Sequence, residues 1–360
     1  MRREPRVETD RTVVVVVPGP IGARTGGYEY DRRIIAGLCA LGWSVETREL
    51  DGSFPRPTST ALEGAAGVLG ALPDRAMVMI DGLALGAMPE QVERESSRLR
   101  IIALVHLPLA AEIGLDPGRA SRVRAAERRA LMASTIVVVT GRSTVGAVKT
   151  YGIAPARIAV VEPGTDPAPI ARGSDGGSLQ LLCVATLHRG KGHAILFRTL
   201  TSVASPDWRL TCAGSLTRDP VTVRRLRDQL RSDGLEKRVT LTGEVDAAAL
   251  NALYDGADLF VLPTLHETYG MAVAEALARG LPVVSTRTGA IAELVGDDSG
   301  MLVDPGDEEA FASALIRVMT DRLLRMRLAN GACRARRRLP TWEDAAKNMS
   351  GVLCRLGVRL

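Results

Sequence analysis

The chain has 360 residues, 46% of them hydrophobic and 24% charged, with a formal net charge of +5 at pH 7. This length exceeds one ordinary hydrophobic core and fits two domains, and the apolar content is ample for globular folding. The mild, dispersed positive charge suits an anionic ligand or an anionic membrane surface, and it does not indicate a nucleic-acid partner.

The first half of the chain is predicted to alternate strands with helices. A β-branched run at residues 12–17 indicates a central strand of a parallel sheet, and a helix over 28–41 and a strand over 43–50 follow it. Further short strands are expected over residues 76–81, 101–105, 136–140 and 157–161. This order predicts an α/β fold with a parallel sheet.

Two places in this half have residues suited to ligand contacts. A glycine-rich loop before the first helix contains Gly26, Gly27 and Tyr28. It suits a phosphate or a sugar, although it matches neither GxGxxG nor a P-loop, and a tight turn that needs glycine is the alternative. His106 follows the fourth predicted strand, at the edge where parallel sheets bind ligands, and Glu112 lies shortly after it. A purely structural histidine is the alternative.

A basic helix and a linker follow. The helix over residues 119–131 (RASRVRAAERRAL) is either a solvated face or a docking surface for an anionic membrane that holds a lipid acceptor. Residues 163–178 are rich in proline, glycine, serine and alanine, a composition typical of linkers.

The second half repeats the alternation of strands and helices. Strands are expected over residues 179–185, 208–213, 239–242, 259–262, 282–285 and 301–303, with helices between them and after residue 311. The run TLHRGKG at residues 186–192 opens the first of these helices. The helix dipole disfavours a lysine there, so a bound anion explains Lys191 better than stability does.

Residues 263–293 (PTLHETYGMAVAEALARGLPVVSTRTGAIAE) form a strand-end turn, a helix and the next strand. Backbone amides at Tyr269, Gly270 and Met271 would suit a phosphate at the helix start, and Gly270 would keep the approach open. Glu267 precedes the helix, and Glu275 lies about one and a half turns into it.

Carboxylates accept hydrogen bonds from sugar and ribose hydroxyls, so two of them beside a phosphate cradle suggest a sugar nucleotide. Two solvated glutamates on a surface helix explain the same spacing.

This run resembles the E-x7-E signature of retaining GT-B glycosyltransferases, in particular glycosyltransferase family 4. Glu267 and Glu275 are the two glutamates, and the flanking matches are Pro263, Gly270, Ala276, Gly280, Leu281, Pro282, Val283, Gly289 and Glu293. The resemblance extends to the pair Gly26–Gly27, to His106 and to Lys191–Gly192. One position departs from the pattern: Thr186 stands where the family has arginine, and Arg189 follows three residues on.

The resemblance implies a GT-B fold, in which two Rossmann-like domains face each other across a cleft. We expect an acceptor-binding domain at residues 1–165 and a domain for the nucleotide-sugar donor at 166–339. A last helix at 340–360 is expected to cross back to the first domain.

The resemblance also implies roles for individual residues. Lys191, with Arg189 as a candidate substitute for the missing arginine, would neutralise the diphosphate leaving group. Glu267 would hold the transferred sugar, and His106 would approach it. The implied donor-binding residues are Glu275, Gly270, Tyr269, Met271, Gly214, Val245 and Thr186, and those of the acceptor or phosphate loop are Gly26, Gly27, Tyr28 and Glu112.

The expected reaction is metal-independent transfer, with retention of configuration, from a nucleotide diphosphate sugar to a hydroxyl of a glycan, a lipid or a small metabolite. The chain has no D-x-D motif, and we expect no cofactor beside the co-substrate. A sugar-nucleotide epimerase or a phosphorylase of the same fold, or an inactive nucleotide-sugar-binding scaffold, remains open. The missing GxGxxG disfavours a Rossmann dehydrogenase.

The five cysteines form no CxxC pair, and no apolar run reaches about 18 residues. We therefore expect a cytoplasmic protein without a membrane span, with a peripheral contact to the inner membrane face through the basic helix.

Overall fold

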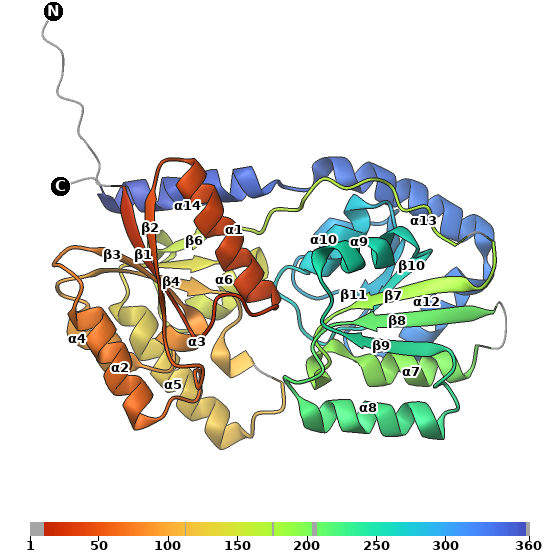
Figure 1. Cartoon of the computed structure of the whole chain (residues 1–360), viewed down its shortest axis with the longest axis horizontal. Helices are drawn as coiled ribbons and strands as arrows, with labels where there is room; N and C mark the ends of the chain where they lie inside the picture. Colours follow the sequence, from red (N-terminus) through yellow and green to blue (C-terminus); the bar gives the residue numbers. More distant parts are fainter. Residues whose placement is uncertain (1–10, 112, 175, 204–206, 358–360) are drawn as a thin grey trace, which may run out of the picture. The chain divides into compact units, whose positions relative to one another are not determined.

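The protein is described from a computed structural model that covers residues 11–111, 113–174, 176–203 and 207–357. It divides into two compact units, each built on a six-stranded sheet (Figure 1). Unit 1 spans Met1–Gly164 and Trp342–Leu360, and unit 2 spans Thr165–Thr341. Glu112, an expected acceptor-site residue, lies outside the described residues.

The sheet of unit 1 is parallel throughout, in the order β2-β1-β3-β4-β5-β6. Its strands are β1 Thr12–Val17, β2 Ser44–Glu49, β3 Met77–Asp81, β4 Arg100–Val105, β5 Ile136–Val139 and β6 Ile158–Val160. Its helices are α1 Gly26–Ala40, α2 Ser59–Gly70, α3 Gly82–Leu85, α4 Pro89–Glu95, α5 Pro117–Ala133, α6 Arg142–Lys149 and α14 Trp342–Gly357.

Helices cover both faces of this sheet (Figure 1), which explains why its inner strands β1, β3, β4 and β5 are apolar without alternation. In β1, Val13, Val15 and Val17 pack with α1 and α14. Val14 and Val16 belong to the core on the opposite face, which they share with α2, α4, α5 and α6.

The last helix, α14, is an integral part of unit 1. A Cβ on Gly37 of α1 would lie 2.5 Å from the Cβ of Ala346, so the two helices touch where α1 has no side chain. The Trp43 indole nitrogen donates a hydrogen bond of 2.9 Å to the Ser350 hydroxyl. The chain thus returns to unit 1 after completing unit 2.

The sheet of unit 2 is also parallel, in the order β12-β11-β10-β7-β8-β9. Its strands are β7 Leu179–Val184, β8 Trp208–Ala213, β9 Val239–Gly243, β10 Leu259–Leu262, β11 Val283–Thr286 and β12 Gly300–Val303. Its helices are α7 His193–Thr201, α8 Pro220–Ser232, α9 Ala247–Asp255, α10 Met271–Ala278, α11 Ile291–Val295, α12 Glu308–Thr320 and α13 Arg322–Ala335.

Both strand orders contain a point where the chain reverses its direction across the sheet. In unit 1 this point lies between β1 and β3, and in unit 2 between β7 and β10. The loops that leave two neighbouring strands there run to opposite sides and open a crevice at the carboxyl ends. The sheet topology therefore marks one candidate binding position in each unit.

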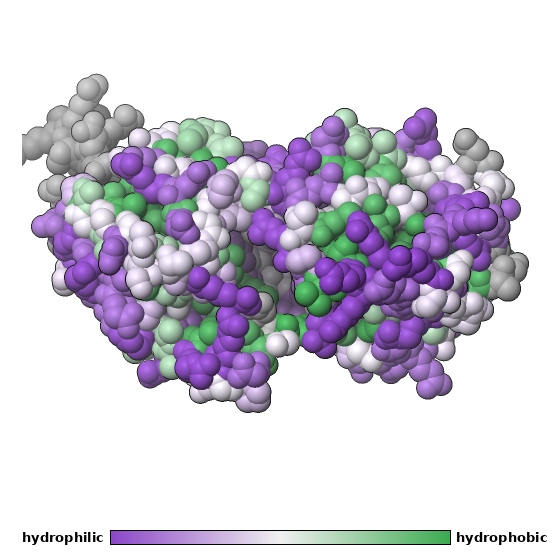
Figure 2. Space-filling view, turned by 60° about the horizontal axis from the view of Figure 1, so that its bottom comes forward, coloured by the Kyte–Doolittle hydropathy of each residue, from purple (hydrophilic) through white to green (hydrophobic). Residues whose placement is uncertain are grey.

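The surface is mainly polar. Figure 2 shows hydrophilic residues spread over the displayed face, with apolar residues in smaller groups among them. No helix in the described ranges combines the length and apolar character that crossing a bilayer requires.

Candidate functional site

The crevice of unit 2 brings together two residues that the sequence singled out, Lys191 and Glu267. Lys191 follows β7 and Glu267 follows β10, the two strands on either side of the reversal. The Lys191 ammonium donates a hydrogen bond to the Glu267 carboxylate, and the pair is an ion pair. Their side chains are 19% and 17% exposed, so both charges are shielded from water yet still reachable.

Backbone contacts hold the two loops together. The Leu265 amide donates a hydrogen bond of 2.7 Å to the Gly190 carbonyl, and the Thr264 hydroxyl donates another of 3.2 Å to the same oxygen. Gly192 has a φ of +70°, and a Cβ there would lie 2.0 Å from the Pro263 carbonyl oxygen. Only glycine fits this position, so the local sequence fixes how Lys191 meets the β10 loop.

Helices α7 and α10 both begin beside this ion pair. Each has a glycine at its N-cap, Gly192 and Gly270, and neither start is capped by a side chain. The amino ends of both helices carry partial positive charge and suit an anion.

The backbone at Gly270 gives a steric reason for glycine beside the predicted approach to phosphate, which stays a prediction. Its φ is +97°, and a Cβ would lie 2.9 Å from Cγ1 of Ile291. The side chain of Tyr269 is buried with Ala274 and Ala290, and Met271 packs against the same group. Tyr269 and Met271 thus offer a ligand mainly their backbone.

Glu275 has partners of its own. Its carboxylate accepts a hydrogen bond of 2.9 Å from the Tyr254 hydroxyl, whereas Glu267 faces Lys191. Arg279 lies over the Tyr254 ring at 4.4 Å. Burial, followed by the charge of Glu275, raises the pKa of Tyr254 well above its ordinary value, so this hydroxyl remains a donor.

The other expected donor-side residues lie in the loops that follow β7, β8 and β9. Gly214 follows β8, and a Cβ there would lie 2.9 Å from the Thr186 amide nitrogen, so these two loops touch. Val245 is half-buried in the turn after β9. Arg189 is exposed, and among the described residues no hydrogen bond or ion pair holds its guanidinium. Of the two cations, Lys191 is therefore better placed to meet a ligand in the crevice of unit 2.

His188 is a neighbour that the sequence analysis did not single out. Its Nδ1 accepts a hydrogen bond of 3.1 Å from the Gly190 amide. Burial and then the charges of Lys191 and His193 lower the pKa of His188 to about 4, so it is neutral at physiological pH. Its position in the TLHRGKG run, three residues before Lys191, could have identified it as a site residue.

The crevice of unit 1 holds His106, at the carboxyl end of β4. Its Nε2 lies 3.1 Å from Oδ1 of Asp31 and 3.5 Å from Oδ2 of Asp81. Asp31 is fully buried in α1, and Asp81 ends β3. Burial lowers the pKa of His106, but the charge and hydrogen bond of Asp31, followed by those of Asp81, raise it to about 10. At neutral pH the imidazole is therefore a cation.

Gly27 and His106, both expected at a site, are in contact: a Cβ on Gly27 would lie 3.3 Å from Cδ2 of His106. The predicted start of the first helix was wrong by two residues. The Thr25 hydroxyl accepts a hydrogen bond from the Tyr28 amide and caps α1, so Gly26 and Gly27 form its first turn instead of the preceding loop. The Tyr28 hydroxyl donates to the Pro18 carbonyl and closes that loop.

The sequence analysis missed both carboxylates around His106. Asp81 ends a predicted strand at the edge where ligands bind, which was a usable indication. Asp31 sits among polar neighbours on a helix, and its sequence position does not distinguish it from a surface residue.

Residues 178–321 match the family model described as Glycosyl transferases group 1. This segment is similar to members of that family. The matched segment contains Lys191, Glu267 and Glu275. The resemblance to GT-B glycosyltransferases is confirmed, and the narrower assignment to family 4 stays a prediction.

Two curated relatives share the name D-inositol 3-phosphate glycosyltransferase. That from Xylanimonas cellulosilytica is 32% identical over 253 residues, covering 66% of this chain and 60% of the relative. The relative from Corynebacterium glutamicum is 29% identical over 223 residues, which cover 56% of this chain and 52% of the relative. The chain thus spans 60% or less of the length of these relatives.

Solved structures extend the likeness to nearly the whole chain. Sucrose-phosphate synthase from Thermosynechococcus elongatus has a TM-score of 0.80 at 20% identity, over 96% of this chain and 98% of that one. Anabaena HepE in complex with UDP-glucose has a TM-score of 0.74 at 17% identity, and the match covers 95% of this chain and 99% of HepE. The expected GT-B fold, with two parallel α/β sheets, is confirmed.

Proposed function

We propose that the protein is a glycosyltransferase that moves a sugar from a nucleotide diphosphate sugar to an acceptor hydroxyl. One observation carries the proposal: Lys191 and Glu267 pair at the strand reversal of a group 1 glycosyltransferase segment, beside the uncapped starts of α7 and α10. A cation and two helix amino ends suit a diphosphate, and a carboxylate suits a sugar hydroxyl.

In this proposal the resting ion pair opens when the donor binds. Lys191 turns to the diphosphate and stabilises the negative charge that grows as the bond to the sugar breaks. Glu267 is then free to accept hydrogen bonds from the sugar ring. Glu275, already oriented by the Tyr254 hydroxyl, receives the ribose.

We further propose a retaining mechanism without a catalytic metal, which the resemblance to retaining GT-B glycosyltransferases supports. The leaving phosphate would take the proton of the acceptor hydroxyl on the same face. The contribution of the protein is then orientation and charge stabilisation.

On the acceptor side we assign Gly26, Gly27 and His106 of unit 1. An anionic acceptor is supported by a cavity of about 240 Å³ in this unit. Arg119 and Arg122 of the basic helix α5 line it together with apolar Leu109 and Leu115. Since two relatives are named for D-inositol 3-phosphate, this compound is the first acceptor to test.

The test is a mass-spectrometric screen of the whole protein with UDP-, GDP-, ADP- and dTDP-sugars, with and without D-inositol 3-phosphate. We expect release of one nucleoside diphosphate together with a glycosylated product. Lys191→Ala should lower the rate about 100- to 1,000-fold, the usual cost of losing one charge-stabilising donor. Lys149→Ala, at an exposed lysine of α6, is the matched control and should leave the rate unchanged.

Other outcomes separate the alternatives. An isomerised or hydrolysed donor without an acceptor would indicate an epimerase. Nucleotide binding in a thermal-shift assay without turnover, even with pooled cell-extract acceptors, would indicate an inactive scaffold. Absence of binding to every nucleotide would overturn the assignment.

A further inference from the structure

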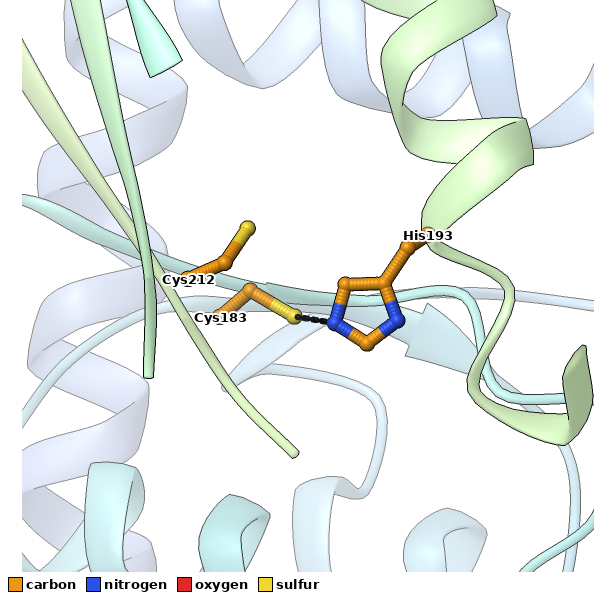
Figure 3. A group of neighbouring side chains, drawn as sticks. All are labelled: Cys183, His193 and Cys212. Carbon is orange, nitrogen blue, oxygen red and sulfur yellow. Dashed lines mark hydrogen bonds between the residues drawn. The ribbon is translucent and has the colours of Figure 1, made fainter. Parts of the chain in front are cut away.

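Three buried side chains that the proposed transfer does not use lie together in unit 2. Cys183 is on β7, Cys212 is its direct register partner on β8, and His193 is the first residue of α7 (Figure 3). Their ligand-type atoms all lie within 4.8 Å of one another. Both cysteines are fully buried and His193 is 1% exposed, so water does not solvate them.

Protein contacts leave this imidazole poorly satisfied. Nε2 of His193 lies 3.7 Å from Sγ of Cys183, and Nδ1 is buried without a hydrogen-bond partner among the described residues. The surroundings are apolar, with the Phe197 ring 6.4 Å away. Burying such groups without partners costs free energy, and buried polar groups in proteins are nearly always bonded. A cation bound by the two sulfurs and Nε2 would give these three atoms a stronger partner, while Nδ1 points away from the sulfurs (Figure 3).

We propose that Cys183, Cys212 and His193 form a binding site for a Zn²⁺ ion. Two sulfurs and one imidazole nitrogen are a known zinc donor set, and the softness of thiolates favours Zn²⁺ over Mg²⁺ or Ca²⁺. Both thiols must lose their protons to bind the ion, so two protons leave for each Zn²⁺ taken up.

The ion would act on the proposed catalytic region through the backbone. His193 follows Gly192 and Lys191 directly, so a bond from its imidazole to a metal held on β7 and β8 would fasten the start of α7 to the sheet. This role is structural, and it does not depend on the glycosyltransferase proposal.

The experiment strips the whole protein with a chelator and titrates it with Zn²⁺ against a chromophoric competitor. Bound metal is then counted by plasma mass spectrometry. We expect one equivalent per chain and a higher melting temperature with Zn²⁺. The Cys183→Ser/Cys212→Ser double variant should lose both effects. Cys39→Ser, which alters an exposed cysteine of α1, is the matched control and should keep them.

A second measurement uses only the unaltered chain, so it does not depend on the folding of a variant. Co²⁺ in place of Zn²⁺ should give thiolate-to-cobalt charge-transfer bands and the visible bands of tetrahedral cobalt. No zinc uptake, equal uptake by the double variant, cobalt spectra without thiolate bands, or a Cys183–Cys212 disulfide in protein that takes up no zinc would each overturn the site. Transferase activity is not a readout here, so failure of this proposal leaves the proposed function intact.

Discussion

At the scale of single residues, His106 shows how two distant carboxylates set the charge of an imidazole. Asp31 and Asp81 come from α1 and β3, and both face the same nitrogen. Replacing Asp31 by Asn should lower the pKa of His106 from about 10 toward its ordinary value of 6.5. The chain has four histidines, so an NMR titration of the imidazole C–H signals can follow each one. An unchanged titration in Asp31→Asn would contradict the assigned cause.

The raised pKa of His106 also predicts how stability depends on pH. Since the folded pKa lies above the unfolded value, the stabilisation is complete below pH 6.5 and is lost as the pH rises through about 10. His106→Gln should therefore cost about 1–3 kcal/mol near neutral pH, the usual penalty for leaving a buried partner unsatisfied, and less at pH 10.5. Urea unfolding of both proteins across this range measures the difference, and a cost that grows with pH would have the wrong sign.

The ion pair of Lys191 and Glu267 predicts opposite effects on binding and on turnover. In Glu267→Gln the lysine loses its competing anion, so UDP alone should bind more tightly, by about fivefold for a pair worth about 1 kcal/mol. Turnover should fall because a neutral amide accepts hydrogen bonds from the sugar hydroxyls less strongly than a carboxylate does. Calorimetric titration with UDP and a rate assay separate the two, and weaker UDP binding would show that Glu267 does not compete for Lys191.

At the scale of elements, most strands and helices could be predicted from the sequence. The short segment that joins β7 to α7 at the candidate site could not. The strands at 12–17 and 259–262 have the predicted bounds, because a continuous apolar run is a local signal. The helix expected to open within residues 186–192 is instead a 3₁₀ turn, Arg189–Lys191, followed by α7 from His193. The positive φ of Gly192 separates them, and a Cβ at this position would clash with the Pro263 carbonyl oxygen.

Two glycine substitutions test this local account. Gly192→Ala should destabilise the protein by about 1–3 kcal/mol from the left-handed backbone alone, and by more from the contact with Pro263. Gly67→Ala in α2 should stabilise it by about 0.5–1 kcal/mol, because nothing lies within 4 Å of its added Cβ and alanine favours a helix. Denaturant unfolding compares both variants with the parent. Equal effects would mean that Gly192 is not held in its strained conformation.

At the scale of the whole molecule, unit 1 is assembled from two separate parts of the chain. Ala345, Met349, Val352 and Leu353 of α14 complete the core layer that β1 and α1 begin. No local sequence pattern shows which residues make contact when they are far apart in the chain. The contacts of Asp31 with His106 and of Lys191 with Glu267 are of this kind. The sequence alone therefore supplied the candidates Lys191, Glu267 and His106, but not the pairs that hold them.

Met349→Ala tests the place of α14. Removing this buried side chain should cost about 2–5 kcal/mol. Hydrogen exchange followed by mass spectrometry should show faster exchange in peptides from β1, α1 and α14, with β7 and β10 of unit 2 unchanged. Leu315→Ala in α12 is the converse control, because it should speed hydrogen exchange in peptides of unit 2 and leave those of unit 1 unchanged. Faster exchange confined to α14 would show that the helix is only peripheral.

The split composition of unit 1 has a consequence for biosynthesis. A ribosome makes the six strands of unit 1 first, but the helix that covers one face of their sheet emerges only after all of unit 2. The continuous unit, Thr165–Thr341, can finish folding while its predecessor still exposes apolar side chains of β1 and α1. We therefore expect stalled nascent chains that end before Trp342 to engage chaperones through their earliest-made segment.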